Sequence, residues 1–164
     1  MEQLISIPVV VLLTFLQLSL SGKFMILNGF SDLIFIWLVS WIIQIKLKNS
    51  WLWIIMAWSV MSFISAIPWY ATAISYLCVL GIASLVKGRL WQSPLLSFLL
   101  VLIIGSFLNL FIGFISLKVN GSMIQLSDSF NRIILPSVVM NLVFALPIYL
   151  ISRDMILWLY PSKE

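Results

Sequence analysis

The 164-residue chain has no histidine, a single cysteine (Cys78) and only five acidic residues. With one thiol and no imidazole, it can form neither an intrachain disulfide nor a Cys/His zinc cluster nor a histidine-dependent hydrolase triad. Two of the acids lie at the extreme ends, which leaves Asp32, Asp128 and Asp154. We therefore expect a protein that is not an enzyme and that holds no metal or cofactor.

Charge is also scarce, since charged residues make up 9% of the chain and hydrophobic residues 63%, with a mean hydropathy of +1.18. A soluble domain carries about a quarter charged residues, and disorder needs low hydrophobicity. The apolar runs are continuous, whereas the strands of a membrane barrel alternate in polarity. The nine Lys and Arg residues are scattered between these runs, as membrane-interface anchors are, and do not indicate nucleic-acid binding. We predict an all-α integral membrane protein in a single domain, residues 1–164.

The uncharged runs predict the helices, because about 20 residues are needed to cross the hydrocarbon core. The run 49–86 is too long for one pass, and Pro68 at its middle can break a helix. If Pro68 only kinks one buried helix, the count falls to five. With the break, we expect a bundle of six transmembrane helices at about residues 4–21, 31–47, 51–67, 69–86, 94–117 and 134–152. The N-terminus lacks the positive region of a signal peptide, so we expect the first helix to be retained.

Six passes place both termini on one side of the membrane, and the positive charges indicate which side. Three cations fall on the opposite side: Lys23, Lys118 and Arg132. Six fall on the side of the termini: Lys46, Lys48, Lys87, Arg89, Arg153 and Lys163. This distribution predicts a multi-pass membrane protein with cytoplasmic N- and C-termini.

The longest polar connection, residues 118–132, falls on the outer side of this topology. Within it Met123, Leu126 and Phe130 recur at i, i+3 and i+7, as in a short interfacial helix. An ordinary surface loop is the alternative.

Two stripes of small and polar residues have helical spacing. One is Gly105, Asn109 and Gly113, and the other is Ser137, Asn141 and Ala145. Such stripes let helices approach closely and share hydrogen bonds in lipid. We expect the two helices to pack on each other or on a shared partner, and a docking face for another protein's helix is the alternative.

Three further residues carry local predictions. Asp32 precedes an apolar helix and favours the positive end of its dipole, so we expect it to cap that helix at the membrane interface. Pro136 suits the first turn of the last helix, where its missing N–H costs nothing, and Pro147 is expected to kink that helix.

Three segments of the chain carry short motifs whose order and spacing are informative together. Residues 27–34 read LNGFSDLI, residues 134–142 read ILPSVVMNL, and residues 145–150 read ALPIYL with Arg153 after them. They resemble the Pro-Asp-Leu, the Leu-Pro-Ser-x-x-x-Asn and the closing segment of the bacterial rod shape-determining MreD family. Ser31 replaces the family's proline, and the Gly- and Asp-containing region between the family's third and fourth helices has no counterpart in residues 61–71. The matched family positions are Asp32, Pro136, Asn141, Pro147 and Arg153.

The resemblance implies a fold similar to the S component of energy-coupling-factor transporters and a non-catalytic role in cell elongation. It implies an MreC-like membrane partner and, through it, a penicillin-binding transpeptidase, a RodA-type membrane glycosyltransferase and the filament MreB. Cell shape and peptidoglycan synthesis would then depend on the protein. The alternative is a vitamin-transporter S component, for which Asn120, Gln125, Asp128 and Asn131 could supply polar groups.

Overall fold

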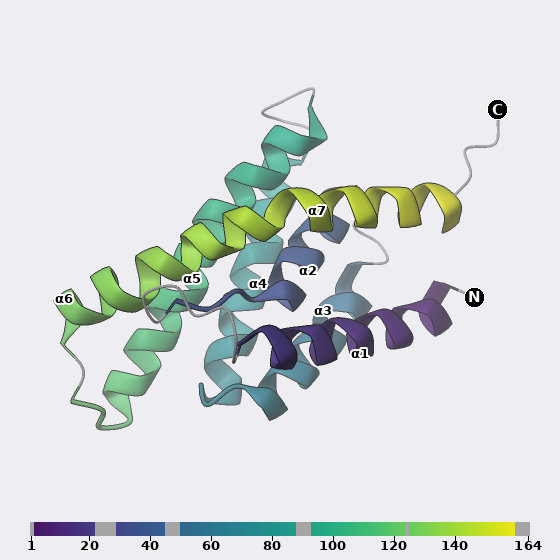
Figure 1. Ribbon diagram of the computed structural model, residues 1–164. Coiled ribbons are helices and arrows are strands. Elements are labelled where there is room, and N and C mark those ends of the chain that lie inside the picture. The colour runs from purple at the N-terminus through teal and green to yellow at the C-terminus, as the bar shows by residue number, and fades with distance from the viewer. Residues whose placement is uncertain (1, 22–28, 45–49, 88–92, 124, 160–164) are drawn as a thin grey trace.

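The computed structural model describes residues 2–21, 29–44, 50–87, 93–123 and 125–159, and all the regular elements in these ranges are helical (Figure 1). The elements are α1 (Glu2–Ser21), α2 (Leu33–Gln44), α3 (Ser50–Ile64), α4 (Trp69–Val86), α5 (Pro94–Val119), α6 (Leu126–Ser129), the π-helical turn η2 (Phe130–Ile134) and α7 (Leu135–Leu159). Each of the six expected helices has a counterpart, although the boundaries move. The last helix continues to Leu159, beyond the expected end at residue 152.

Pro68 separates α3 from α4, as the sequence predicts. It adopts an extended conformation, with φ −55° and ψ 140°, immediately before the first residue of α4. The two helices remain in contact across this turn, because the Trp58 indole donates a hydrogen bond to the Trp69 carbonyl at 2.9 Å. Residues 50–86 therefore form two helices that fold back on each other.

Among the residues that the structure describes, three helices are long and apolar enough to cross a membrane: Trp69–Val86, Pro94–Val119 and the continuous stretch Leu126–Trp158. Three shorter apolar helices accompany them: Pro8–Ser19, Leu33–Gln44 and Ile54–Ile64. Many large apolar side chains are exposed on the surface of the bundle, including Phe63, Leu77 and Leu12. An apolar exterior around an apolar interior suits lipid. The described part of the chain thus has the all-helical, apolar character of a helical membrane protein.

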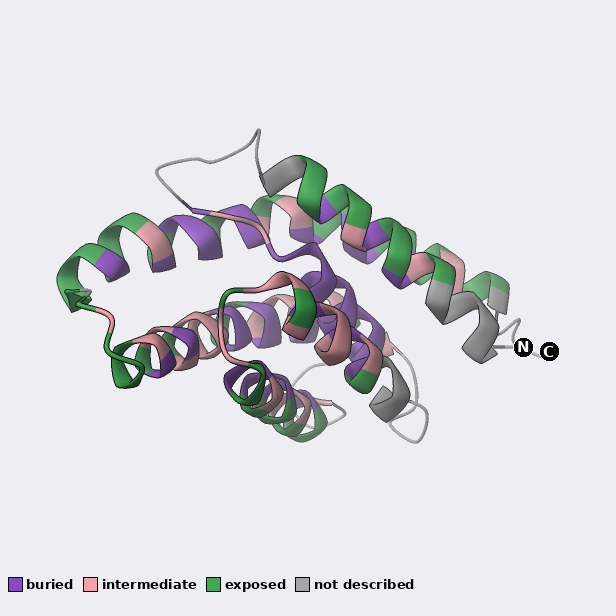
Figure 2. Cartoon of the chain, turned by 90° about the horizontal axis from the view of Figure 1, so that it is seen from below, coloured by how far each residue is buried: buried purple, intermediate pink, exposed green. Residues whose placement is uncertain are grey.

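Helix α2 lies at the centre of the bundle. Every residue from Leu33 to Ile43 is buried, and Figure 2 shows this helix in purple with the partly exposed helices around it. A helix that is hydrophobic on all sides is stable only where neighbours surround it. Its 12 residues extend about 18 Å, which is shorter than the roughly 30 Å of a hydrocarbon core.

The last helical region is continuous from Leu126 to Leu159 and contains one π turn. The Leu135 N–H donates to the carbonyl of Phe130, five residues back. Pro136 follows directly and has no N–H to donate, so the wider turn falls where the α-helical ladder is interrupted. The regular part of α7 begins at Leu135, which places Pro136 in its first turn, and α7 continues through Pro147. Of the residues expected to form a short outer helix, Leu126 and Phe130 therefore belong to an extension of α7, whereas Met123 lies outside the helix.

The first turn of α1 and the last turn of α7 lie at the same end of the molecule (Figures 1 and 2). Several sequence predictions fall outside the described residues: the beginning of segment 27–34, the expected helix end at 45–47, and the cations Lys23, Lys46, Lys48, Arg89 and Lys163.

Candidate functional site: the polar junction at the start of α2

An extended segment, residues 29–32, leads into α2 and lies against the first turns of α7. A Cβ atom on Gly29 would lie 2.6 Å from the Pro136 Cβ and 2.8 Å from the Ser137 backbone nitrogen. Only glycine allows two backbones to approach this closely. The contact is secured by a hydrogen bond of 3.1 Å from the Phe30 N–H to the Ser137 hydroxyl.

Asn141 joins this segment to α5. Its carbonyl oxygen accepts a hydrogen bond from the Asp32 N–H at 2.9 Å, and its amide nitrogen donates to the Ser106 hydroxyl at 3.0 Å. The side chains of all three residues are buried. Non-helical backbone within a membrane protein must find its partners inside the protein, and Asn141 supplies one here.

The first turn of α2 is capped by side chains. The Asp32 carboxylate accepts a hydrogen bond from the Phe35 N–H at 3.0 Å, which is the capping role predicted from the sequence. The Ile34 N–H donates to the Gln17 side-chain oxygen at 3.3 Å, and the Gln17 amide donates to the Met61 sulfur at 3.6 Å. The start of α2 is thus connected to α1 and α3 as well as to α7.

The position of Asp32 differs from the expectation. The sequence places it at the membrane interface, whereas the structure buries it, with 5% of its surface exposed. Through Asn141 it lies level with Ser106, which is halfway along α5. The reason is that α2 is short and begins deep inside the bundle, where its polar end needs partners from the chain.

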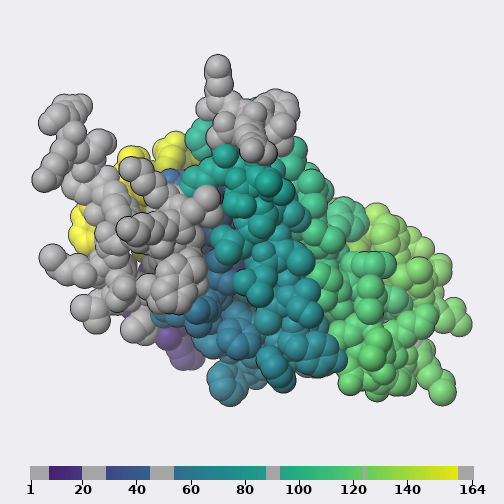
Figure 3. Space-filling model, turned by 180° about the vertical axis from the view of Figure 1, so that it is seen from behind, coloured from purple at the N-terminus to yellow at the C-terminus, as the bar shows by residue number. Residues whose placement is uncertain are grey.

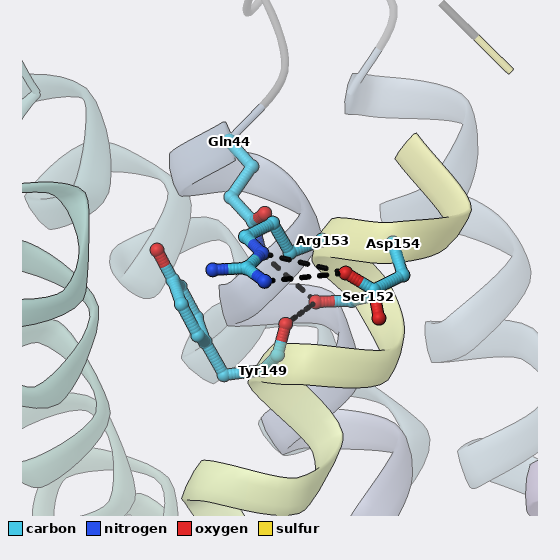
Figure 4. A network of polar contacts seen from close by, with 5 residues as sticks. All are labelled: Gln44, Tyr149, Ser152, Arg153 and Asp154. Atoms are coloured by element: carbon cyan, nitrogen blue, oxygen red, sulfur yellow. Dashed lines mark hydrogen bonds and ion pairs between the residues drawn. The ribbon is translucent and has the colours of Figure 1, made fainter. Parts of the chain in front are cut away.

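The far end of α2 has its own polar contacts. The Lys87 ammonium donates to the Ile42 carbonyl at 2.8 Å, where a cation is favourable at a helix C-terminus. Burial lowers the pKa of Lys87 from its usual value. Figure 4 shows the Gln44 amide donating to the Ser152 hydroxyl at 2.9 Å, and this hydroxyl also contacts Ser40. Both ends of α2 are therefore held by side chains from other helices.

Arg153 and Asp154, also drawn in Figure 4, pair with each other at 3.4 Å on the exposed side of α7. Their side chains are 52% and 70% exposed. Exposed pairs of this kind contribute at most about 1 kcal/mol, so the pair is not a major element of the fold.

The stripe on α5 faces α4 and α2. A Cβ atom on Gly105 would lie 3.1 Å from atoms of both Phe35 and Val79. The Asn109 side chain accepts a hydrogen bond from the Ser75 hydroxyl at 2.7 Å. At Gly113 the nearest atom would be the end of the Ile67 side chain, at 2.8 Å.

The stripe on α7 faces the segment that leads into α2. Ser137, Asn141 and Ala145 are all buried, and the first two form the hydrogen bonds described above. Asn141 also joins α7 to Ser106 on α5, and the two helices pack directly on each other, as the sequence predicts. Both stripes in addition reach α2 or its leading segment, through Gly105 and through Ser137 and Asn141. Because these residues are covered by the chain's own helices, they do not form an open groove for the helix of another protein.

The apolar residues of the outer connection lie beside a groove. It has a volume of about 600 Å³ and separates α5 from α6 and η2, with Phe107, Phe111, Leu126 and Phe130 among the lining residues. The rings of Phe107 and Phe130 stack with centroids 6.4 Å apart. Met123, which precedes Leu126 in the chain, is fully exposed. Figure 3 shows the green side chains of α5 and α6 protruding at one edge of the molecule.

No family model, curated protein or solved structure matches this chain. In the described residues, no group of three or more His, Cys, Asp or Glu residues could hold a metal ion. The Asp32 N–H donates to Asn141, and the Asp32 carboxylate caps α2 by accepting from the Phe35 N–H. The hydrogen bonds of this junction therefore fix the position of the backbone at the start of α2.

Sequence reasoning missed two residues of this junction. Gly29 lies within segment 27–34, and its place before a helix start in an apolar chain was the available signal. No pattern in the sequence singles out Ser106, because a serine beside a glycine is common in apolar helices and its partner Asn141 is distant in the chain.

Proposed function

We propose that this chain is a non-catalytic membrane scaffold of the bacterial cell-elongation machinery, similar in role to the MreD family. The observation that carries the proposal is the junction between residues 29–34 and α7. The hydrogen bonds Phe30–Ser137 and Asp32–Asn141 join positions 107 and 109 residues apart in the sequence. These contacts join two of the three segments that resemble the family, so residues that carry the resemblance also hold the bundle together.

The proposed topology has six passes in the bacterial inner membrane, with cytoplasmic N- and C-termini. Its support is the presence of six helices besides the short α6 and η2, together with the location of both described chain ends at one end of the molecule. The excess of cations on the side of the termini gives the orientation. The bundle would resemble the S component of energy-coupling-factor transporters.

The partner proposed for this scaffold is an MreC-like protein with a single transmembrane helix. The groove between α5 and α6 suits such a helix, because aromatic anchors in a concave apolar surface dominate binding energies. Phe111 and Phe130 are 45% and 41% exposed there. Met123 and Leu126 would meet the outer part of the partner. Through it the scaffold would reach the transpeptidase, the RodA-type glycosyltransferase and MreB.

Co-expression with an MreC-like protein, followed by affinity purification, tests this proposal. We expect the wild-type chain to recover the partner and Leu126→Lys to lose it, because a buried lysine in the groove would be desolvated. The matched control is Leu85→Lys on α4, a similarly exposed leucine beside Lys87. Equal recovery by both variants would place the partner elsewhere, and no recovery by the wild type would reject the scaffold.

The second candidate, a vitamin-binding S component, is favoured by a cavity of about 450 Å³ near the ends of α1, α3 and α5. This volume lies within the range of small-molecule sites. However, Asn120, Gln125, Asp128 and Asn131, the polar residues expected for a vitamin site, do not line it. Tight binding of a water-soluble vitamin by the purified chain, together with no recovery of the MreC-like partner, would favour this candidate.

A further inference from the structure

The cavity of about 450 Å³ is partly open and is lined by five parts of the chain. These are the end of α1, the extended segment before α2, the turn between α3 and α4, the second half of α5, and the region of α6 and η2. Most of the lining is aliphatic or aromatic, with Leu18, Ile64, Leu110, Phe114 and Ile133 as examples. Cavities with apolar walls stay dry, since a water molecule needs two to four polar partners. The interior is therefore suited to an apolar occupant.

Three polar side chains line the cavity, and two of them have partners in the fold. Gln17 binds the Ile34 N–H and the Met61 sulfur, while Ser65 accepts a hydrogen bond from the Ile67 N–H at 3.1 Å. The hydrogen bonds of Gln17 and Ser65 therefore connect neighbouring parts of the cavity lining.

The third polar residue, Ser129, has an unpartnered hydroxyl. Ser129 is 3% exposed, and its oxygen has no hydrogen-bond partner within the described residues. Other helical serines, such as Ser75 and Ser84, donate to a carbonyl three residues back. Leaving a buried hydroxyl unpaired costs about 1–3 kcal/mol, so a ligand atom that accepts its proton would be favoured here.

Charged residues adjoin the lining residues in the sequence. Lys118 follows Leu117 on α5, and Arg132 precedes Ile133 in η2, whereas Asp128 precedes Ser129. All three charged side chains are exposed, and none of them forms an ion pair with another within the described part of the chain. Two cations against one anion favour an anionic group at this end of the molecule.

We propose that this cavity binds the acyl chain of an anionic membrane amphiphile, whose ester or carboxyl oxygen accepts a hydrogen bond from Ser129. The anionic head lies towards Lys118 and Arg132. The acyl chain belongs either to a phospholipid or to a free fatty acid, since both present the same chemistry to the cavity. This site does not depend on the proposed scaffold role, because, apart from Ile134, its lining residues differ from those of the groove lined by Phe107 and Phe111.

Native mass spectrometry of the purified full chain in detergent tests the proposal, with oleic acid and phosphatidylglycerol titrated separately as probes. We expect saturable binding of one probe molecule, and the probe that binds identifies the source of the acyl chain. Ser129→Phe should abolish binding by filling the cavity, and Ser129→Ala should weaken it about 2- to 10-fold by removing one hydrogen bond. Ser84→Phe is the control, since it makes the same change on an exposed face of α4.

Leu117→Trp provides a second way to fill the cavity, should Ser129→Phe fail to fold. Saturable binding that Leu117→Trp or Ser129→Phe removes and Ser84→Phe retains supports the site. Equal binding by the filled variants and the control would assign the lipid to the outer surface and overturn the proposal. Absence of saturable binding by either probe would overturn it as well.

Discussion

Replacing Asn141 with alanine should destabilise the bundle more than the same change at Asn109, although both residues are asparagines on the two stripes. Asn141→Ala removes the acceptor for the Asp32 N–H and leaves that backbone donor buried without a partner. An orphaned buried donor costs about 1–3 kcal/mol. The Ser106 hydroxyl loses the Asn141 donor but, as a helical serine, can turn to a carbonyl of its own helix.

Asn109→Ala leaves no group without a partner. The Ser75 hydroxyl lies 2.7 Å from the Asn109 oxygen and 2.9 Å from the Thr72 carbonyl, so after the change its one proton can turn fully to Thr72. The loss is then about 0.6 kcal/mol, the average for interhelical hydrogen bonds in membranes. The difference between the two variants should be roughly 1–2 kcal/mol.

Thermal unfolding in one detergent, followed by tryptophan fluorescence, measures this difference. At about 2–4 °C per kcal/mol, Asn141→Ala should lower the Tm by roughly 4–8 °C and Asn109→Ala by roughly 1–2 °C. Ser106→Ala should lie closer to Asn141→Ala, because it leaves the buried Asn141 amide donor without its acceptor. If Asn109→Ala lowered the Tm as much as Asn141→Ala, the orphaned Asp32 N–H would not be the dominant cost, and the argument for the junction would fail.

Three further predictions follow from the same contacts. Gly29→Ala should prevent a stable fold, because the new methyl group meets the α7 backbone, whereas Gly81→Ala on an open face should stabilise by about 0.5–1 kcal/mol; similar Tm values for the two would contradict the close approach. Asp32→Asn should preserve thermal stability, because asparagine also caps, while Asp32→Ala should lose about 0.5–2 kcal/mol; equal losses would show that the charge matters more than the cap. Reporter fusions after Arg89 should be cytoplasmic and those within 120–130 external, and a cytoplasmic signal from 120–130 would refute both the helix count and the orientation.

The location of the helices could be predicted from the sequence because it depends on local chemistry. Continuous apolar runs define helices in lipid, and Pro68 cannot continue one of them, so the break between α3 and α4 is visible without a structure. The cap at Asp32 is likewise local, since the carboxylate and the Phe35 N–H are three residues apart. The outer connection was predicted less well, because the π turn before Pro136 joins it to α7.

The arrangement of the candidate junction could not be predicted from the sequence. Asn109 and Asn141 have the same local pattern of small residues at four-residue spacing, yet one bonds to Ser75 on α4 and the other to the backbone of Asp32. Nothing local to Gly29 or Ser106 indicates that Pro136 and Asn141 are their neighbours, because each contact joins segments distant in the chain.

What the sequence alone determined is therefore the membrane-embedded class, the approximate helices and the cap of α2. The tertiary structure decided that α2 is buried on every side, that the stripe on α5 meets α4 and α2 while the stripe on α7 meets the segment before α2, and that Ser129 lines a cavity. The physical reason is that an apolar side chain is stable both against lipid and against another helix. Helices such as α4 and α5 are apolar all round, so their sequences do not distinguish the packed face from the lipid-facing one, and only the contacts between helices do.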